Sequence, residues 1–286
     1  ITPVHILSHY DDTLGDFAHT GLRCAGENPI ARRALRQAGF QVLVAGRRYG
    51  KGSSREHSPT AEKLAGVRLV IAESFERIYR QNADNIGLFT STNFSLLDRI
   101  ERGEAITLAD LLQGREPLAA SILSAGGLLR WGQRFLRGHD APPCEREPLL
   151  ANAAPQTLFD KILHRHRLAA PHTPEQPQAG DGLFVQADWR FIHEYYTGMA
   201  DTLLRGALGE HFRLQRPDQI VVFEDHSSYV EESPAHVRGG LIANMHAMSS
   251  AQRDFAARHG LRMHRTLTDA EVLQDDGSNV AGISHA

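Results

Sequence analysis

Short apolar runs alternate with helix-like stretches in the first part of the chain. Residues 41–45 (QVLVA) and 67–72 (VRLVIA) are apolar runs of strand length. Each is followed by a stretch that predicts a helix: residues 53–64, which open with serine, and residues 75–86, with Ser74 as the expected N-cap. Because strands that alternate with helices favour parallel βαβ units, the pattern predicts the α/β class.

The alternation is interrupted once. After residues 101–136, which predict largely helical or mixed structure, a stretch rich in proline and alanine covers residues 139–156. Beyond it a clear buried strand is predicted at residues 219–223 (QIVVF), with helices at residues 192–204 and 246–259. The pattern therefore predicts two α/β portions joined by a linker: residues 1–137, the linker 138–156, and residues 157–286.

Composition narrows the functional classes. The chain has 286 residues, of which 41% are hydrophobic and 23% charged, and its net charge is −3. This balance offers no basic surface and argues against nucleic acid as a partner. The sequence contains no run of about 18 apolar residues that would predict a membrane span. Its first residues lack the basic and apolar regions of a signal peptide, so we expect a cytoplasmic, soluble protein.

Cysteine usage limits the metal chemistry. Cys24 and Cys144 are the only cysteines, and they form no C-x-x-C pair. Two distant thiols make no disulfide framework and cannot supply the ligands of a closed cysteine-bound cluster. We therefore expect no metal site within this chain.

The first candidate site is the sequence G-S-S-R-E-H at residues 52–57, where a predicted strand gives way to a predicted helix. Free N–H groups at the start of a helix attract anions, and such donors beside an arginine favour the deprotonated form of a serine. Arg55 carries a planar fork that suits a carboxylate. Simple helix capping by a serine, with the charged residues paired on the helix surface, is the alternative that these residues favour by themselves.

The second candidate site is the pair Asp225 and His226, just beyond the predicted strand at residues 219–223. Ligands of open α/β folds bind beyond the carboxyl ends of the strands. An aspartate beside a histidine can orient the imidazole for proton delivery. A polar loop after a strand is the simpler alternative for an isolated pair of this kind.

A family resemblance adds to these observations. The segment Leu43–Gly87 resembles the swivel domain of aconitases and isopropylmalate dehydratases, through G-S-S-R-E-H and through the later A-E-S-F-x-R-I-x-x-x-N. In that family the second serine of the pair removes the Cα proton of the substrate, and the arginine after it binds a substrate carboxylate. The resemblance thus implies Ser54 as the base and Arg55 as a substrate-binding residue, with Ser53 contributing hydrogen bonds.

A further substrate-recognition loop of the family lies upstream of the first strand. The residues here, 11–23 (DDTLGDFAHTGLR), depart from the usual D-T-D pattern of the family. His19, Thr20 and Arg23 are the candidate substrate contacts, and a polar surface loop is the alternative. The substrate therefore stays open between isopropylmalate, citrate-like acids, their homologues and an acid of secondary metabolism.

The second portion resembles the start of the large, cluster-binding part of the same family. The similar segments are TLFDKILH at 157–164, VQADWRFIHEYYTGMA at 185–200, R-P-D…D-H at 216–226 and G-I-S-H at 282–285. The resemblance implies that Asp225, His226 and His285 act near the substrate hydroxyl and that His193 contacts the substrate. Three other histidines match nothing in the family, and we expect them at the surface or on helix faces: His246, His259 and His264.

The resemblance implies a swivel-type α/β domain followed by part of an α/β/α aconitase-like domain. The implied enzyme is a hydro-lyase or isomerase that moves a hydroxyl between adjacent carbons of a hydroxy di- or tricarboxylic acid by dehydration and rehydration. The D-S-H-T motif and cysteine ligands of the family do not occur here. We therefore expect a [4Fe–4S] cluster only in a complete protein, with the remainder of the large domain as a required partner. Two alternatives are an RNA-binding or regulatory protein on the aconitase scaffold and an inactive partner subunit.

Overall fold

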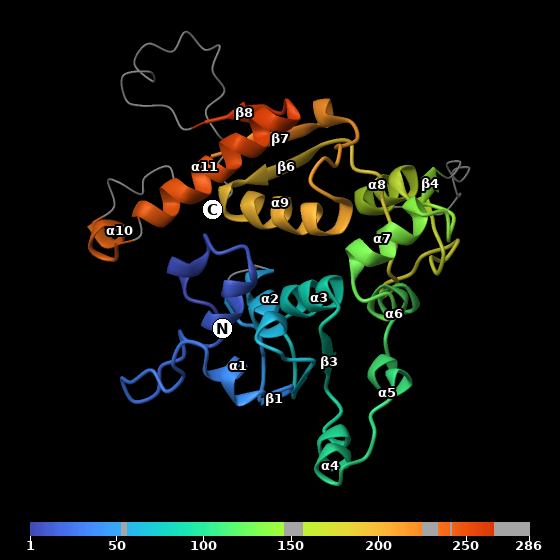
Figure 1. The fold of residues 1–286 in the computed structure, drawn as a ribbon. Coiled ribbons are helices and arrows are strands. Elements are labelled where there is room, and N and C mark those ends of the chain that lie inside the picture. The colour runs from blue at the N-terminus through green and yellow to red at the C-terminus, as the bar shows by residue number, and fades with distance from the viewer. Residues whose placement is uncertain (53–55, 146–156, 225–233, 241, 266–286) are drawn as a thin grey trace. The chain divides into compact units, whose positions relative to one another are not determined.

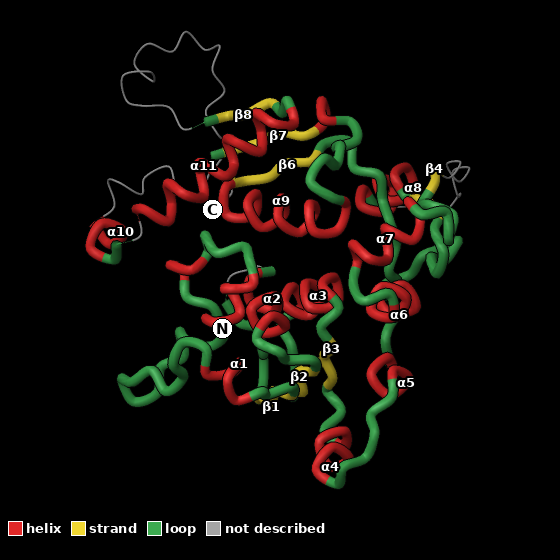
Figure 2. The backbone as a smooth tube through the Cα atoms, viewed as in Figure 1, coloured by secondary structure: helices red, strands yellow, loops and turns green. Residues whose placement is uncertain are grey.

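The computed structural model describes residues 1–52, 56–145, 157–224, 234–240 and 242–265. Contacts between Cα atoms divide the chain into two compact units, which are described separately. The central unit is Ala38–Ala187, and the composite unit combines Ile1–Gln37 with Asp188–Ala286. Each unit contains a parallel sheet together with helices (Figure 1, Figure 2), which confirms the predicted α/β class.

The central unit is built on a three-stranded parallel sheet in the order β1–β2–β3. The middle strand is fully buried because it lies between two neighbours and carries only apolar side chains; Leu69 and Ile71 pack on Leu96. The elements are β1 (Val42–Ala45), α2 (His57–Leu64), β2 (Leu69–Ala72), α3 (Arg77–Ile86) and β3 (Phe89–Ser91). The two predicted strands and the parallel βαβ order are confirmed, whereas β3 was not predicted.

Helix α3 begins later than the sequence predicted. Its N-cap is Glu76 and not Ser74. Ser74 is engaged elsewhere: its carbonyl oxygen accepts a hydrogen bond from the Tyr49 N–H at 2.9 Å, and its hydroxyl oxygen accepts one from the Arg48 N–H at 2.8 Å. These bonds occupy Ser74 outside the helix, so the helix starts after it. The helix ends as predicted at Gly87, whose backbone is left-handed.

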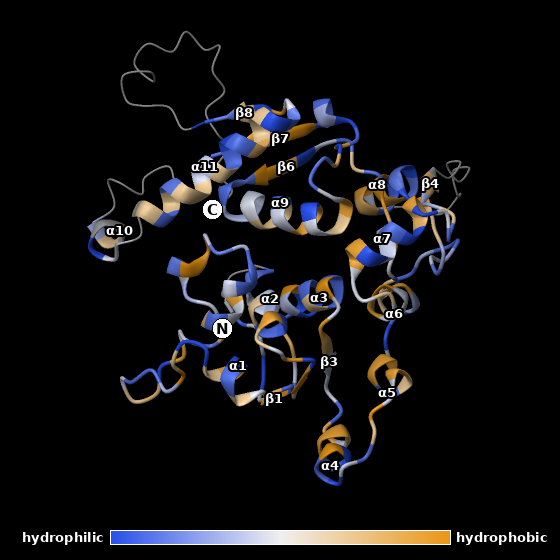
Figure 3. Ribbon diagram, in the orientation of Figure 1, coloured by the Kyte–Doolittle hydropathy of each residue, from blue (hydrophilic) through white to orange (hydrophobic). Residues whose placement is uncertain are grey.

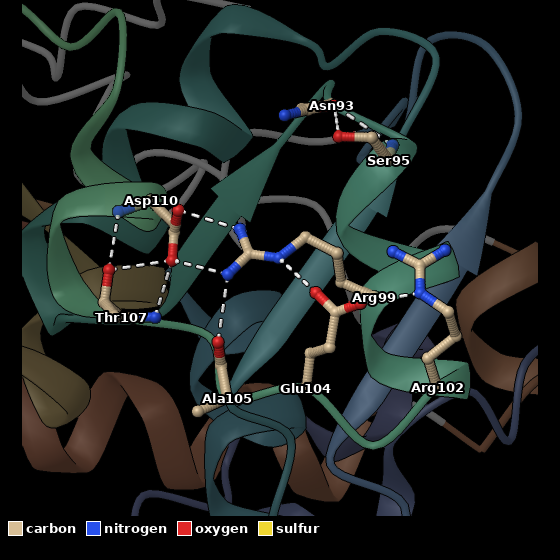
Figure 4. A network of polar contacts seen from close by, with 8 residues as sticks. All are labelled: Asn93, Ser95, Arg99, Arg102, Glu104, Ala105, Thr107 and Asp110. Carbon is tan, nitrogen blue, oxygen red and sulfur yellow. Dashed lines mark hydrogen bonds and ion pairs between the residues drawn. The ribbon is translucent and has the colours of Figure 1, made fainter.

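Helices fill much of residues 101–136, as predicted. Arg99 in α4 ties this helix to the segment that follows it (Figure 4), because its guanidinium binds both carboxylate oxygens of Asp110 at 2.8 and 3.2 Å. Asp110 also closes a capping box with Thr107 at the start of α5. The bounds are α4 (Ser95–Glu101), α5 (Leu108–Leu112), α6 (Pro117–Ser124) and α7 (Leu128–Leu136).

Residues beyond α7 complete the central unit. Trp131 in α7 stacks on Phe184 with 4.9 Å between ring centroids, so the residues just before position 187 pack with α6 and α7. Strands β4 and β5 pair antiparallel. The bounds are β4 (Cys144–Glu145), α8 (Leu158–His166) and β5 (Leu168–Ala169). Strand β4 thus falls within the predicted linker, and the predicted boundaries at residues 137 and 157 stay predictions.

The composite unit contains a second parallel sheet, in the order β6–β7–β8. Its apolar middle strand (Figure 3) packs through Ile220 and Val222 in a buried cluster with Phe255 of α11 and Leu261, which lies between α11 and β8. The elements are β6 (Arg190–His193), α9 (Glu194–Leu208), η3 (Pro217–Gln219), β7 (Ile220–Phe223), α10 (Pro234–Arg238), α11 (Ile242–His259) and β8 (Arg262–His264). The strand and the two helices predicted here are confirmed; α9 ends, and α11 begins, four residues beyond the predicted bounds. Residues 192 and 193, predicted as the start of the first helix, instead end strand β6, and neither β6 nor β8 was predicted.

The N-terminal segment packs on α9 and α11 within the composite unit. Leu7 is fully buried and contacts Tyr195, Met245 and Met248. Asp16, also buried, lies within ion-pair distance of three arginines: Arg32 and Arg33 at 3.6 Å and Arg36 at 3.1 Å. The segment contains η1 (Val4–Ile6), η2 (Asp12–Phe17) and α1 (Ala34–Ala38).

Candidate functional site

The loop that follows β1 leads toward the first candidate site. Tyr49 in this loop is fixed on both sides of its peptide: its N–H donates to the Ser74 carbonyl oxygen at 2.9 Å, and its carbonyl oxygen accepts from the Glu76 N–H at 2.8 Å. Two ion pairs join the same segments: Arg47 with Glu73 at 2.9 Å and Arg48 with Glu76 at 2.6 Å. The loop therefore starts from a point held by the connection between β2 and α3.

The loop ends at the beginning of α2. Gly50 and Gly52 have φ angles of +84° and +140°, in the region that favours glycine. The N-cap of α2 is Glu56 and not a serine, and burial raises the pKa of its carboxyl. His57, the first helical residue, is fully buried. The described flanks thus form the predicted strand–loop–helix junction, while three predicted site residues lie outside the described residues: Ser53, Ser54 and Arg55.

The second candidate region is the carboxyl edge of the β6–β7–β8 sheet. The register pairs His193 of β6 with Phe223 of β7, and Phe223 with His264 of β8, so all three strands end at one edge. The ring of His193 is buried and lies 4.4 Å from that of Tyr196, measured between centroids. The carbonyl oxygen of His193 accepts a hydrogen bond from Thr197 at 2.9 Å, inside the first turn of α9. His193 is therefore a constrained side chain at the edge where ligands of α/β folds bind.

Two further residues lie at this edge, and the sequence did not predict either of them as part of a site. Glu224 is buried, and its carboxylate accepts hydrogen bonds from Arg253 in α11. A polar residue that directly precedes Asp225 and follows a buried strand was a signal that could have been used. His264 was expected on the surface or on a helix face; it is half-exposed, ends strand β8 and stacks on Phe223 with 5.1 Å between ring centroids.

Four predicted site residues remain to be placed: Asp225, His226, His285 and Arg23. Asp225, His226 and His285 lie outside the described residues. Arg23 is exposed and belongs to no helix or strand; the next residue, Cys24, forms an isolated bridge with Glu27. The structure therefore brings Arg23 together with none of the other predicted site residues that it describes.

Metal ligands and membrane segments were sought in the described residues. Within the ranges given above, no group of three histidine, cysteine or acidic side chains is arranged to hold a metal ion. Both cysteines are exposed, Cys24 in the composite unit and Cys144 in the central unit. Among the helices of the same ranges, none is long and apolar enough to cross a membrane.

Comparisons with known proteins cover the strand–loop–helix junction of the first candidate site. Residues 18–93 match the family described as the aconitase C-terminal domain. The 3-isopropylmalate dehydratase small subunit of Syntrophus aciditrophicus is 40% identical over 111 residues, which cover 34% of this chain and 68% of that protein. The corresponding small subunit of Pyrobaculum calidifontis is 38% identical over 118 residues, covering 36% of this chain and 73% of that one.

A solved structure is also similar in sequence. The crystal structure of 3-isopropylmalate dehydratase from Methanocaldococcus jannaschii is 33% identical and covers 34% of this chain and 66% of that chain. Its TM-score of 0.27 is too low to support a statement about the fold.

The matched segment contains the strands of the β1–β2–β3 sheet. The match includes β1, the glycine-containing loop, α2, β2 and α3, so the family similarity covers the elements that flank the first candidate site. The chain belongs to the aconitase/3-isopropylmalate dehydratase superfamily.

Proposed function

We propose that this chain forms part of a hydro-lyase or isomerase that moves a hydroxyl between adjacent carbons of a hydroxy di- or tricarboxylic acid, as 3-isopropylmalate dehydratase or aconitase does. The observation that carries the proposal is the family match over residues 18–93, which includes the G-S-S-R-E-H sequence. The coarser statement, a dehydratase-like role, rests on relatives that are named dehydratase small subunits.

The proposed chemistry divides between the two candidate regions. At the first, Ser54 takes the Cα proton of the substrate, Arg55 holds a carboxylate, and Ser53 contributes hydrogen bonds. The start of α2, three residues beyond Ser54, supports this assignment because free N–H groups at a helix start stabilise a developing negative charge.

The second region supplies the acid side in this proposal. Asp225, His226 and His285 deliver the proton to the departing hydroxyl, and His193 contacts the substrate. The buried position of His193 at the carboxyl edge of β6 supports its part. Arg23 is proposed as a further substrate contact.

The cofactor of the family does not fit the residues that the structure describes. A [4Fe–4S] cluster needs several thiolates, and the chain contains two exposed cysteines that belong to different units. We therefore propose that a cluster, with its ligands, belongs to a partner portion that completes the enzyme. The printed name "small subunit" of the relatives supports a larger companion.

The experiment that tests the proposal compares two variants, Ser54→Ala and Arg55→Lys, in the completed and anaerobically reconstituted enzyme. Each is assayed against a panel of hydroxy-diacids and -triacids. Ser54→Ala should lower kcat by about 10²–10⁴-fold with little change in KM, because a base acts chiefly in the transition state. Arg55→Lys should mainly raise KM, because an arginine on a carboxylate acts in the ground state as well.

The capping alternative predicts a different result. Since Glu56 is the N-cap of α2, a Ser54 that only supports the start of this helix should, when changed to alanine, lower the free energy of unfolding by at most about 0.5–2 kcal/mol and leave kcat near normal. Thermal melts of the same two proteins separate the outcomes. A Ser54→Ala enzyme with near-normal kcat would refute Ser54 as the base.

A further inference from the structure

A buried carboxyl lies beneath the loop of the first candidate site. Glu62 of α2 is fully buried, and its two carboxylate oxygens accept hydrogen bonds from the hydroxyls of Tyr49 and Tyr79, one each. A carboxyl is removed from water at a large free-energy cost unless hydrogen bonds replace the lost solvent. The two tyrosine hydroxyls provide such bonds.

The two tyrosines come from different segments. Tyr49 belongs to the loop after β1 and Tyr79 to α3, and their rings meet edge to face with 5.2 Å between centroids. Phe75 completes the aromatic cluster, stacked on Tyr79 at 6.2 Å and edge-on to Tyr49 at 6.1 Å. Through Glu62, one carboxyl therefore connects α2, α3 and the loop.

The cluster also touches the glycine that leads toward the serines. Gly50 has a φ angle of +84°, and a Cβ added there would clash with the ring of Tyr79. The backbone of Gly50 thus lies directly on this ring. Since Tyr49 is fixed at its own N–H and carbonyl groups, the path of residues 50–52 is set by Tyr49 on one side and by Tyr79 beneath it.

Stability alone gives no reason for an acid at this position. A buried ionic or polar group can often be replaced by a well-packed apolar side chain of similar volume without loss of stability. Hydrogen bonds are directional, so the bonds to Glu62 fix the positions of the two hydroxyls relative to each other, which an apolar contact would not do. Burial and the charge of Glu62 both raise the pKa values of Tyr49 and Tyr79, so the two hydroxyls keep their protons and act as donors.

We propose that Glu62 is a positioning residue for the proposed base: it holds Tyr49 and Tyr79, and these two side chains fix the Gly50–Gly52 backbone, the last described residues before Ser53. This role rests on the proposed function of Ser54. Glu62 itself touches no substrate in this proposal, and it acts only through the loop.

The test measures the loop and the catalysis separately. Glu62→Leu keeps the volume of the side chain and removes both acceptors. Hydrogen exchange at the amides of Tyr49 and Lys51, which donate to the carbonyl oxygens of Ser74 and Arg48, should speed up by about tenfold or more, because the two hydrogen bonds to Glu62 no longer oppose opening. In the completed enzyme, kcat should fall by about 10–100-fold with KM nearly unchanged, the effect expected of a misplaced base.

Two further variants keep the result interpretable. Tyr49→Phe removes one hydroxyl and keeps the ring, so it should reproduce part of both effects even if Glu62→Leu folds poorly. Thr60→Val is the matched control: Thr60 is a buried residue of the same helix, its hydroxyl has no hydrogen-bond partner among the described residues, and the variant should change neither readout.

The outcomes distinguish the two proposals. Unchanged exchange at the amides of Tyr49 and Lys51 in Glu62→Leu, and at Lys51 in Tyr49→Phe, would overturn the positioning role. Faster exchange with a normal kcat, in an enzyme that Ser54→Ala inactivates, would also overturn it while leaving Ser54 as the base. If Ser54→Ala has a normal kcat, the proposed function fails, and the role of Glu62 in positioning a base fails with it, whatever the exchange shows.

Discussion

At the scale of single residues, a buried ion pair shows how burial and charge compete. Arg115 donates to a carboxylate oxygen of Asp84 at 2.8 Å and to the carbonyl oxygen of Thr90 at 2.7 Å. The side chain of Arg115 is 4% exposed and that of Asp84 is 13% exposed. Burial raises the pKa of Asp84 from 3.8 to about 6, although the Arg115 guanidinium acts in the opposite direction. The desolvation of this carboxyl therefore outweighs its attraction to the arginine.

The sign of the resulting pH dependence follows from linkage. The folded protein binds the Asp84 proton more tightly than the unfolded chain does. The contribution of Asp84 to stability is therefore fully present below about pH 4, the ordinary range of the carboxyl. It is lost as the pH rises through about 6, the pKa in the folded state.

Arg115→Met should lower the free energy of unfolding at pH 7 by about 3–5 kcal/mol, because it leaves the Asp84 carboxylate buried without its partner. At pH 5 the loss should be smaller, since Asp84 is then protonated and needs no counter-charge. Urea denaturation at both pH values measures the difference. Arg102→Met is the control, because Arg102 forms an exposed ion pair with Glu104 and such pairs contribute at most about 1 kcal/mol. An equal loss at pH 5 and pH 7 would contradict the coupling of Arg115 to Asp84.

The residue scale is also where sequence patterns were least reliable. Ser74 was the natural N-cap by residue type, but Glu76 takes that position because the loop after β1 occupies both the carbonyl and the hydroxyl of Ser74. Glu62 lies in a predicted helix, and nothing local to it indicates that Tyr49 and Tyr79 bind its two oxygens. Contacts between residues far apart in the chain decide both cases, and periodicity does not report them.

At the scale of elements, a close backbone approach fixes the end of α3 against the turn between α6 and α7. Gly87 has a φ angle of +75°, and a Cβ there would clash with the carbonyl oxygen of Gly126. In the same contact between the two backbones, a Cβ on Gly127 would lie 2.6 Å from the carbonyl oxygen of Asn85. Glycine is thus required twice, for backbone conformation and for space.

Gly87→Ala should therefore destabilise the protein more than left-handed strain alone explains. Gly114→Ala is a matched control, since Gly114 has a nearly equal φ angle of +72° and nothing within 4 Å of an added Cβ. The control should lose about 1–2 kcal/mol from strain. Gly87→Ala should lose a further 1–3 kcal/mol or so because the backbones must separate. Urea denaturation of both variants measures these losses, provided that the m-values are unchanged. Equal losses in the two variants would contradict a close contact between the backbones of Gly87 and Gly126.

Strands were predicted according to their apolar character. Strands β1, β2 and β7 come from continuous apolar runs and were predicted, whereas β3, β6 and β8 have three or four residues with mixed polarity and were not. All three lie at the sides of their sheets, as β1 also does, and pairing with a buried middle strand there stabilises sequences that have little strand signal of their own. The junction between β1 and α2 was predictable because its glycines, serines and flanking apolar runs are all local features.

At the scale of the whole molecule, the sequence pattern and the contacts group the chain differently. The linker composition of residues 139–156 predicts a domain over residues 1–137, and that boundary stays a prediction. The contacts instead combine Ile1–Gln37 with Asp188–Ala286. The burial of Leu7 against α9 and α11 is one such contact between distant parts of the sequence. Composition marks where a linker is tolerated, but it does not show which segments pack together.

Leu7→Ala tests this grouping. Because Leu7 is fully buried, the variant should lose about 2–5 kcal/mol from the part of the protein in which Leu7 packs. If the N-terminal segment belongs to the composite unit, the amides of α9 and α11 should exchange hydrogen faster in the variant, and those of β1 and β2 should keep the rates of the parent protein. Leu136→Ala is the control, since Leu136 is exposed and its loss should change neither set. Faster exchange confined to β1 and β2 would instead support a domain over residues 1–137, because the cavity left by Leu7→Ala would then destabilise the sheet of that domain.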